Sequence, residues 1–201
     1  MKKKYKEIFL NFIGVFFLLI GILAIQSSLY KQTPTQILYM CYIGLILIGG
    51  GILTRNSFIV LSQIYILVLP LLVWDIDFLY QLIVGSPLFG ITDYFFAVGG
   101  ISLDKVITLQ HLFTIPVSIY AVKLIGVKRY DAWKLSFVQI TFVYILVNLV
   151  SSPELNVNCV FYSCVSFLPS YYYYNVLWFV MIFSMTFISS VLINLFLRSR
   201  K

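Results

Sequence analysis

The sequence predicts an all-α, polytopic integral membrane helix bundle of about six transmembrane helices, forming a single domain over residues 1–201. Two features of the composition carry this prediction. Of the 201 residues, 61% are hydrophobic and only 10% are charged, and the mean hydropathy is +0.99. Soluble domains carry roughly 25% charged residues, so this composition is typical of a protein embedded in lipid. A crossing helix needs about 20 mostly apolar residues, which leaves room for six crossings with short connections.

The first apolar segment follows the basic start MKKKYK, as the apolar part of a signal peptide would. It runs from Ile8 to about Ile25, longer than the roughly 7–15 residues of a signal h-region. No small-x-small cleavage site follows it. We therefore expect this segment to be retained as the first crossing.

Five further segments have the length and apolar composition of crossings. The connections 75–107 and 151–175 are long, and they contain apolar pieces that are too short to cross. Because Tyr and Trp favour the headgroup level of a bilayer, we expect these pieces to lie at the interface. The predicted crossings are 8–27, 36–53, 57–74, 109–126, 135–150 and 176–197.

The placement of charge predicts the orientation. With six crossings and both termini in the cytoplasm, all basic residues except Lys31 and Lys105 fall on the cytoplasmic side. An excess of Lys and Arg in cytoplasmic segments is what orients membrane proteins during insertion. We therefore expect cytoplasmic N- and C-termini and a location in the cell membrane. The acids that fall outside are Asp75, Asp77, Asp93, Asp104 and Glu154.

The net charge of +7 follows from these orientation signals and from attraction to anionic headgroups. The basic residues are divided among four separate cytoplasmic segments, so they do not form the single basic face of a nucleic-acid-binding protein. Membrane lipids are the predicted partners and nucleic acid is not. No feature of the sequence specifies a protein partner.

Polar side chains gather at the predicted outer end of the bundle. They come from the end of the third crossing, the start of the fourth, the end of the fifth and the loop SSPELNVN. Because these positions share one depth, the sequence predicts a polar pocket at the outer leaflet. The candidate catalytic residues are His111, Asp75 and Asp77, and the candidate binding residues are Asn148, Asn156, Asn158, Thr114 and Glu154.

The spacing of polar residues predicts a shared polar seam between two helices. His111, Thr114 and Ser118 fall at i, i+3 and i+7 on the fourth crossing, which is one helical stripe. A matching stripe runs from Thr141 to Asn148 on the fifth crossing, and the antiparallel direction brings Asn148 level with His111. Polar side chains inside crossings usually face the bundle interior, so we expect the two stripes to meet.

The aspartates and the loop asparagines differ in direction. Asp75 and Asp77 point about 200° apart on a helix, so only one can face the bundle, and we expect Asp75 to be that one. Asn156 and Asn158 follow Pro153, where an extended chain would point both to one side. Structural interpretations stay open: a hydrogen-bonded histidine, helix-exit aspartates, turn-forming asparagines and stripes that only pack helices.

The sequence predicts no cofactor and no metal site. Cys159 and Cys164 lie in the last outer loop, where either a structural disulfide or two free thiols is expected. Their C-x4-C spacing is not a CxxC redox motif, and the single histidine cannot supply a zinc-binding set. The glycine-containing segments lack the Lys-Ser/Thr end of a phosphate-binding loop.

Two segments, QHLFTIPVSIYAVKL at 110–124 and PELNVNCVF at 153–161, resemble the YwaF-like integral membrane proteins. The similarity covers roughly residues 108–195, with a weaker match at LPLLVWDI. That group is related to a mammalian lysophospholipid acyltransferase and, more distantly, to membrane hydrolases of fatty-acid esters. The resemblance implies a Cys or Thr nucleophile with a histidine, which His111 matches, and a loop asparagine, which Asn158 matches. Trp74 stands where the cysteine is expected.

Three functions are therefore in competition. The first is binding of a lipid or small amphiphile in the outer-leaflet polar pocket. The second is an acyltransferase- or hydrolase-like enzyme with His111 as general base, oriented by Asp75 or Asp77. The third is a structural or assembly subunit whose polar seam only packs helices. Because the family's nucleophile is missing, binding or assembly ranks ahead of catalysis.

Overall fold

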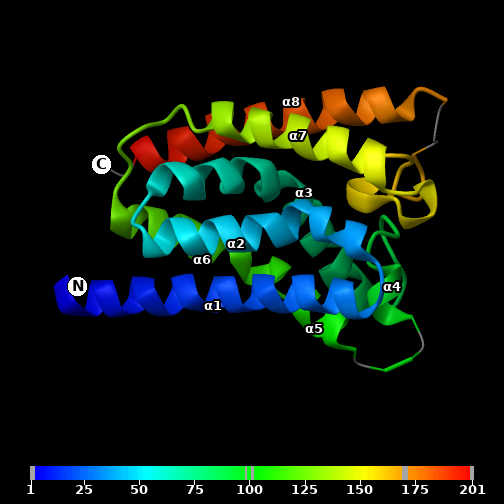
Figure 1. Ribbon diagram of the computed structural model, residues 1–201, viewed down its shortest axis with the longest axis horizontal. Helices are drawn as coiled ribbons and strands as arrows, with labels where there is room; N and C mark the ends of the chain where they lie inside the picture. The colour runs from blue at the N-terminus through cyan, green and yellow to red at the C-terminus, as the bar shows by residue number, and fades with distance from the viewer. Residues whose placement is uncertain (1–2, 98, 101, 169–171, 200–201) are drawn as a thin grey trace.

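The computed structural model describes residues 3–97, 99–100, 102–168 and 172–199, and every regular element in these ranges is a helix (Figure 1). The all-α prediction is thus confirmed for the described residues. The elements are α1 Lys3–Tyr30, η1 Pro34–Leu38, α2 Met40–Leu53, α3 Ser57–Val84, α4 Asp93–Phe96, α5 Leu103–Thr108, α6 His111–Ile125, α7 Trp133–Val150, η2 Pro153–Leu155, η3 Val157–Cys159 and α8 Tyr174–Arg198.

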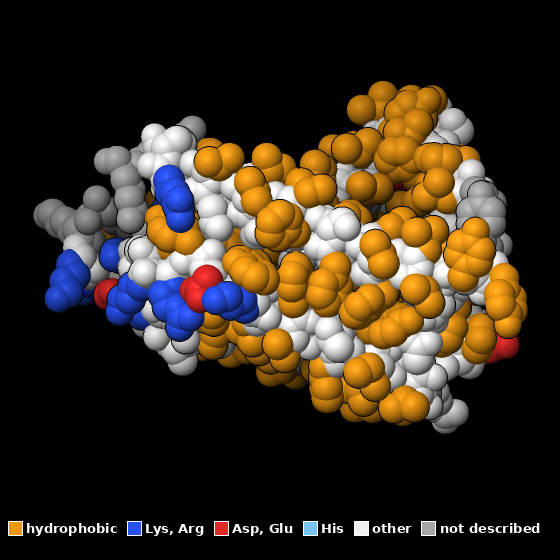
Figure 2. Space-filling model, turned by 90° about the horizontal axis from the view of Figure 1, so that it is seen from above, with side chains coloured by type: hydrophobic (Ala, Val, Ile, Leu, Met, Phe, Trp, Pro, Cys, Tyr) orange, Lys and Arg blue, Asp and Glu red, His pale blue; other side chains and the backbone are white. Residues whose placement is uncertain are grey.

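Within the described ranges, five helical segments are long and apolar enough to cross a membrane, namely α1, α3, α5 together with α6, α7 and α8. They lie side by side along the long axis of the molecule, with α2 among them (Figure 1). Hydrophobic side chains cover most of the face shown in Figure 2, away from the end where Lys and Arg gather. Exposed apolar surface of this extent marks contact with lipid or with another protein, and here it is compatible with a membrane-embedded helical bundle.

Helix α3 forms the centre of the bundle. It packs against α2, α6, α7 and α8, and 61% of its most apolar window is buried, the largest share among the five candidate crossings. Leu61, Ile64 and Tyr65 on this helix are completely buried. The fold is therefore organised around one central helix, and the polar residues of α3 are placed where several helices meet.

Helices α1 and α2 pack with their backbones in close contact. A Cβ atom added to Gly49 would lie 2.8 Å from the carbonyl oxygen of Gly14, so a larger residue would push the helices apart. Small residues at such crossings allow close packing in membrane proteins. This contact seats the short helix α2 against α1.

The third helix is longer than the sequence predicts. We expect the crossing to end at Trp74, but α3 continues as a regular helix to Val84. Pro70 does not interrupt it, and the apolar segment after the aspartates keeps the helical pattern. The helix ends at Gly85, whose left-handed conformation (φ 81°) directs its N–H to the Gln81 carbonyl. The aspartates therefore lie inside α3 and not at its end.

The second predicted crossing, 36–53, is divided in the structure. The 3₁₀ helix η1 begins at Pro34, and Tyr39 (φ −57°, ψ 125°) leaves helical geometry before α2 begins at Met40. The predicted crossings 8–27, 135–150 and 176–197 each lie within one helix, α1, α7 and α8 respectively. The predicted crossing 109–126 corresponds to α6, which the short helix α5 precedes.

Candidate functional site

Asp77 is an anchor for the loop that follows α3. Its side chain is completely buried, and its two oxygens accept four hydrogen bonds. The donors are the backbone N–H groups of Leu88, Phe89 and Thr92, at 3.0, 2.6 and 2.8 Å, and the Thr92 hydroxyl at 2.8 Å. We expected Asp75 to be the inward aspartate, and this is corrected, because the loop folds back over α3 on the side of Asp77.

Asp75 is partly exposed, but one of its carboxylate oxygens is not. The Oδ1 atom is buried and has no hydrogen-bond partner among the described residues. The preceding residue, Trp74, is buried and turns toward α6. The two aspartates thus play different structural parts, as their opposite directions on the helix predict.

His111 begins α6 and packs against α3. Its side chain is 9% exposed, and its ring meets the Trp74 indole edge to face with 4.7 Å between the ring centroids. Both imidazole nitrogens are buried, and neither has a hydrogen-bond partner among the described residues. A neutral imidazole carries one donor and one acceptor, so two hydrogen-bonding positions are open in the interior.

Two neighbours of His111 are buried with it. Gln110 is 2% exposed and Thr114 is 1% exposed. The Thr114 hydroxyl shares its one hydrogen between the Gln110 backbone carbonyl, at 2.7 Å, and the Gln110 Oε1 atom. The Gln110 Nε2 atom has no partner among the described residues. We call Trp74, Gln110, His111 and Thr114 the His111 cluster.

Aromatic side chains of α4 cover the α3 side of the cluster. Trp74 donates from Nε1 to the Tyr94 hydroxyl at 3.1 Å, and its ring stacks on Phe78 with 4.9 Å between centroids. Phe78 in turn meets Phe95 edge to face at 4.9 Å. Burial raises the pKa of Tyr94, so its phenol is neutral at physiological pH and can accept from the indole. The short helix α4 therefore closes the cluster from that side.

The predicted seam between the fourth and fifth crossings is not formed. His111, Thr114 and Ser118 are all buried, as their stripe predicts, but α6 packs against α3 and α2. Helix α7 packs against α3 and α8, and Asn148 is exposed and accepts from Asn175 Nδ2 of α8 at 2.8 Å. The reason is that α3 lies in contact with both α6 and α7. The polar stripe of α6 therefore faces α3 and not α7.

Asn156 and Asn158 shape the loop before α8. Both adopt left-handed backbone conformations, with φ values of 38° and 56°, so the segment is not extended as we expected. Asn tolerates this conformation better than most residues. The Asn156 Oδ1 atom accepts from the backbone N–H groups of Phe161 and Tyr162, at 3.0 and 3.2 Å. Asn156 is therefore an internal brace of its own loop.

Asn158 ties this loop to the start of α2. Its Oδ1 accepts from the Met40 N–H at 2.9 Å, and its Nδ2 donates to the Leu38 carbonyl at 2.8 Å. Its own carbonyl accepts from Trp178 Nε1 at 2.8 Å. One residue thereby joins the break between η1 and α2 to the first turns of α8.

The two loop cysteines, Cys159 and Cys164, form a disulfide, which decides between the two alternatives that the sequence leaves open. Glu154 lies nearby on the surface, and a hydrogen bond from Ser152 lowers the pKa of its carboxyl group. No hydrogen bond or ion pair joins Glu154 to the His111 cluster within the described ranges.

The structure therefore divides the predicted polar pocket into separate groups. His111 and Thr114 share one cluster, with Asp75 beside its Trp74. Asp77 anchors the loop after α3, Asn148 pairs with Asn175, and Asn158 binds the start of α2. Gln110 and Trp74 are the cluster members that sequence reasoning did not include among the candidate site residues. The signal for Gln110 was its place next to the only histidine in an otherwise apolar segment.

Two hollows on the surface of the described residues are apolar for the most part, and neither is lined by His111. One, of about 420 Å³, lies between α7 and α8 and is almost entirely apolar. The other, of about 480 Å³, is lined by α1 and by Leu103 of α5. Among the described residues, no three His, Cys, Asp or Glu side chains come together in a way that could hold a metal ion.

The fold and its buried polar clusters define the class of the protein: an all-α helical bundle compatible with embedding in a membrane. The chain matches no protein-family model, no curated protein and no solved structure. The resemblance to the YwaF-like proteins, with the histidine and asparagine that it assigns, stays a prediction.

Proposed function

We propose that this protein is a polytopic membrane protein that binds the polar part of a lipid or small amphiphile at the His111 cluster. The observation that carries the proposal is the pair of buried imidazole nitrogens without partners. Buried polar groups in folded proteins are nearly always paired, and an unpaired one costs about 1–3 kcal/mol. Two such positions on one ring indicate a group that joins the cluster from outside the chain.

The open positions define the chemistry of that group. His111 offers one donor and one acceptor, and Gln110 offers an unused amide donor. A hydroxyl can both donate and accept, so a hydroxyl-bearing headgroup satisfies this mixture better than an anion or a cation does. The favoured ligand is therefore an amphiphile with free hydroxyl groups.

Binding is favoured over catalysis by what surrounds His111. A general base needs a neighbour that orients it and a nucleophile within hydrogen-bond reach. Neither nitrogen of His111 is hydrogen-bonded to an acid among the residues that the structure describes, and Asp77 already accepts four hydrogen bonds from its loop. Trp74 fills the position where the resemblance implies a cysteine, and its ring packs on the histidine.

For the topology we propose six crossings, with both termini in the cytoplasm and the bundle in the cell membrane. The N-terminal end of α1 and the C-terminal end of α8 lie at the same end of the molecule (Figure 1). The Lys and Arg side chains gather at that end (Figure 2), which supports a cytoplasmic assignment. Helix α2 has 14 residues and is about 21 Å long at 1.5 Å per residue, which is shorter than the hydrocarbon core of about 30 Å. The preceding 3₁₀ helix η1 is therefore needed to complete this crossing.

Native mass spectrometry of the detergent-purified protein tests the binding proposal. We expect the wild type to retain a hydroxyl-bearing amphiphile, and we expect His111→Ala to lose it. Asn148→Ala is the matched control, since Asn148 lies outside the cluster and contacts Asn175. Retention of the same species by folded His111→Ala protein would refute the proposed site and leave the cluster as helix packing.

A further inference from the structure

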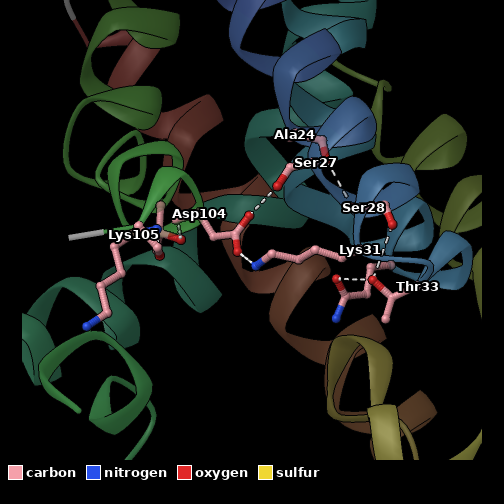
Figure 3. Close-up of polar contacts among 10 residues, drawn as sticks. Ala24, Ser27, Ser28, Lys31, Thr33, Asp104 and Lys105 are labelled. Atoms are coloured by element: carbon pink, nitrogen blue, oxygen red, sulfur yellow. Dashed lines mark hydrogen bonds and ion pairs between the residues drawn. The ribbon is translucent and has the colours of Figure 1, made fainter. Parts of the chain in front are cut away.

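Asp104 of α5 holds the end of α1 through two polar contacts. Its Oδ1 accepts a hydrogen bond from the Ser27 hydroxyl at 2.5 Å, and its Oδ2 forms an ion pair with Lys31 (Figure 3). The Lys31 side chain is 49% exposed and that of Asp104 is 27% exposed. The pair is therefore reachable from the surface and has both charges available to a neighbouring molecule.

A hollow lies directly beside this ion pair. It has a volume of about 480 Å³, and Ser27, which bonds Asp104, is part of its wall. Most of the remaining wall is exposed apolar surface, with Leu29 and Leu103 each 54% exposed. The residues that line it are Leu23, Gln26, Ser27, Leu29, Tyr30 and Leu103. Lys31 and Asp104 do not line the hollow themselves, but each follows a lining residue in the chain, Tyr30 and Leu103 respectively. An apolar wall next to a pair of charges matches an amphiphile better than a wholly apolar ligand.

The position along α1 places the hollow at the level where lipid headgroups meet acyl chains. A helix of 28 residues is about 42 Å long, whereas the hydrocarbon core of a bilayer is about 30 Å thick. The last turns of α1 therefore reach the headgroups, and Lys31 follows them. Leu23 lies two turns deeper, within reach of the acyl chains.

The charges at the edge of the hollow select among headgroups. Lys31 and Asp104 together carry one positive and one negative charge, so their sum is zero. An anionic headgroup that approaches Lys31 is repelled by Asp104, whereas a zwitterionic headgroup can place its phosphate on Lys31 and its ammonium on Asp104. Lys105, the other cation in this region, points away from the pair and donates to the Ala97 carbonyl at 3.0 Å (Figure 3).

From this geometry we propose that the hollow between α1 and α5 is a binding site for one zwitterionic phospholipid. The acyl chain lies along the apolar wall from Leu23 to Leu29, and the headgroup exchanges its charges with Lys31 and Asp104. This site is separate from the His111 cluster and does not depend on the function proposed for that cluster. A lipid seated here also covers exposed apolar surface at the junction of α5 with α1.

Titration of the detergent-purified protein with three lipids, followed by native mass spectrometry, tests the proposal. Phosphatidylethanolamine and phosphatidylcholine carry both charges, and phosphatidylglycerol is the anionic comparison. We expect one ethanolamine lipid to bind roughly tenfold more tightly than the glycerol lipid, since one charge-assisted contact is gained and one repulsion is avoided. Lys31→Gln should weaken that binding roughly tenfold, whereas the control Lys105→Gln should leave it unchanged.

A second variant keeps the proposal testable if Lys31→Gln fails to fold. Leu103→Trp fills the hollow from an exposed position and leaves the ion pair in place, so it should abolish binding of the added ethanolamine lipid while the protein stays folded. Equal affinity for the three lipids would overturn the proposal. Equal weakening by Lys105→Gln, or undiminished binding in Leu103→Trp, would overturn it as well.

Discussion

Gln63 of α3 and Gln139 of α7 donate hydrogen bonds to each other. The Gln63 Nε2 atom donates to Gln139 Oε1 at 2.7 Å, and the Gln139 Nε2 atom donates to Gln63 Oε1 at 3.0 Å. Gln63 is completely buried, and Ser136 of α7 donates to the Ser62 carbonyl at 2.8 Å beside this pair. Polar contacts of this kind fix the position of α7 against the central helix α3. If α7 shifts along α3, both side-chain amides lose their hydrogen-bond partners.

Replacing one of these glutamines should cost more than replacing both. Gln63→Leu leaves the Gln139 amide unpaired against α3, so we expect a loss of about 1–2 kcal/mol in unfolding free energy. In the double variant Gln63→Leu/Gln139→Leu, no unpaired amide remains, and part of that stability should return. Unfolding in mixed micelles measures all three proteins. Strictly additive losses would show that the two amides are not coupled.

Asp77→Asn should release the loop after α3 while leaving the bundle folded. An amide offers one acceptor oxygen in place of two and directs its NH₂ group at groups that now donate to Asp77, such as the Thr92 N–H. We expect faster hydrogen exchange and faster proteolysis between Gly85 and Thr92, with little change elsewhere. Thr92→Ala is the milder comparison, since it removes only one of the four donors. Unchanged exchange in Asp77→Asn would rule out the anchoring role.

The outcome for these polar residues shows what the sequence can predict here. The long apolar segments and the buried stripe of His111, Thr114 and Ser118 depend on local periodicity, and the structure reproduces them. Which helices become neighbours depends on the central place of α3, a non-local property that no spacing within α6 or α7 encodes. The roles of Asp77 and Asn158 also depend on residues distant in the chain, namely the loop at Leu88 and the start of α2.

The helix boundaries were predictable only in part, for a related reason. Acidic residues at 75 and 77 suggested that the third helix leaves the lipid there. Burial of Asp77 with four donors removes the cost of keeping that carboxylate inside the bundle, so the helix continues. A local rule therefore fails where a folded-back loop supplies partners to a charged group.

Asn158 should be essential for joining the last loop to α2, and two replacements separate its contributions. Asn158→Gly keeps the left-handed conformation accessible but loses the bonds to Met40 and Leu38. Asn158→Ala loses the same bonds and also strains the backbone at φ 56°. We expect thermal stability in detergent to fall in the order wild type, Gly variant, Ala variant. An Ala variant as stable as the Gly variant would show that backbone strain contributes nothing.

The disulfide between Cys159 and Cys164 should stabilise the same loop. Closing a short loop restricts the unfolded chain, and we expect the variant Cys159→Ser/Cys164→Ser to lose about 2 kcal/mol. Reductant should lower the melting temperature of the wild type and leave that of the double variant unchanged. The remaining cysteine, Cys41, is a free thiol and offers the reductant no bond to break. The same shift in both proteins would therefore mean that the reductant lowers the melting temperature by a route other than this disulfide.

A pH dependence should arise at the turn between α6 and α7. Arg129 donates to Asp131 from Nε at 3.0 Å and from Nη2 at 2.8 Å, and this pairing lowers the pKa of the Asp131 carboxyl below its ordinary value of 3.8. A lowered folded-state pKa contributes stability that is present above pH 3.8 and is lost as the pH falls through the folded-state value. We therefore expect Asp131→Asn to melt at a lower temperature than wild type at pH 7, and we expect the two melting temperatures to converge as the pH falls below the folded-state pKa of Asp131. The gap at pH 7 should be small and should shrink in high salt, because both side chains are solvated. A gap that stays constant across this pH range would contradict the assignment and point to a packing effect of the substitution.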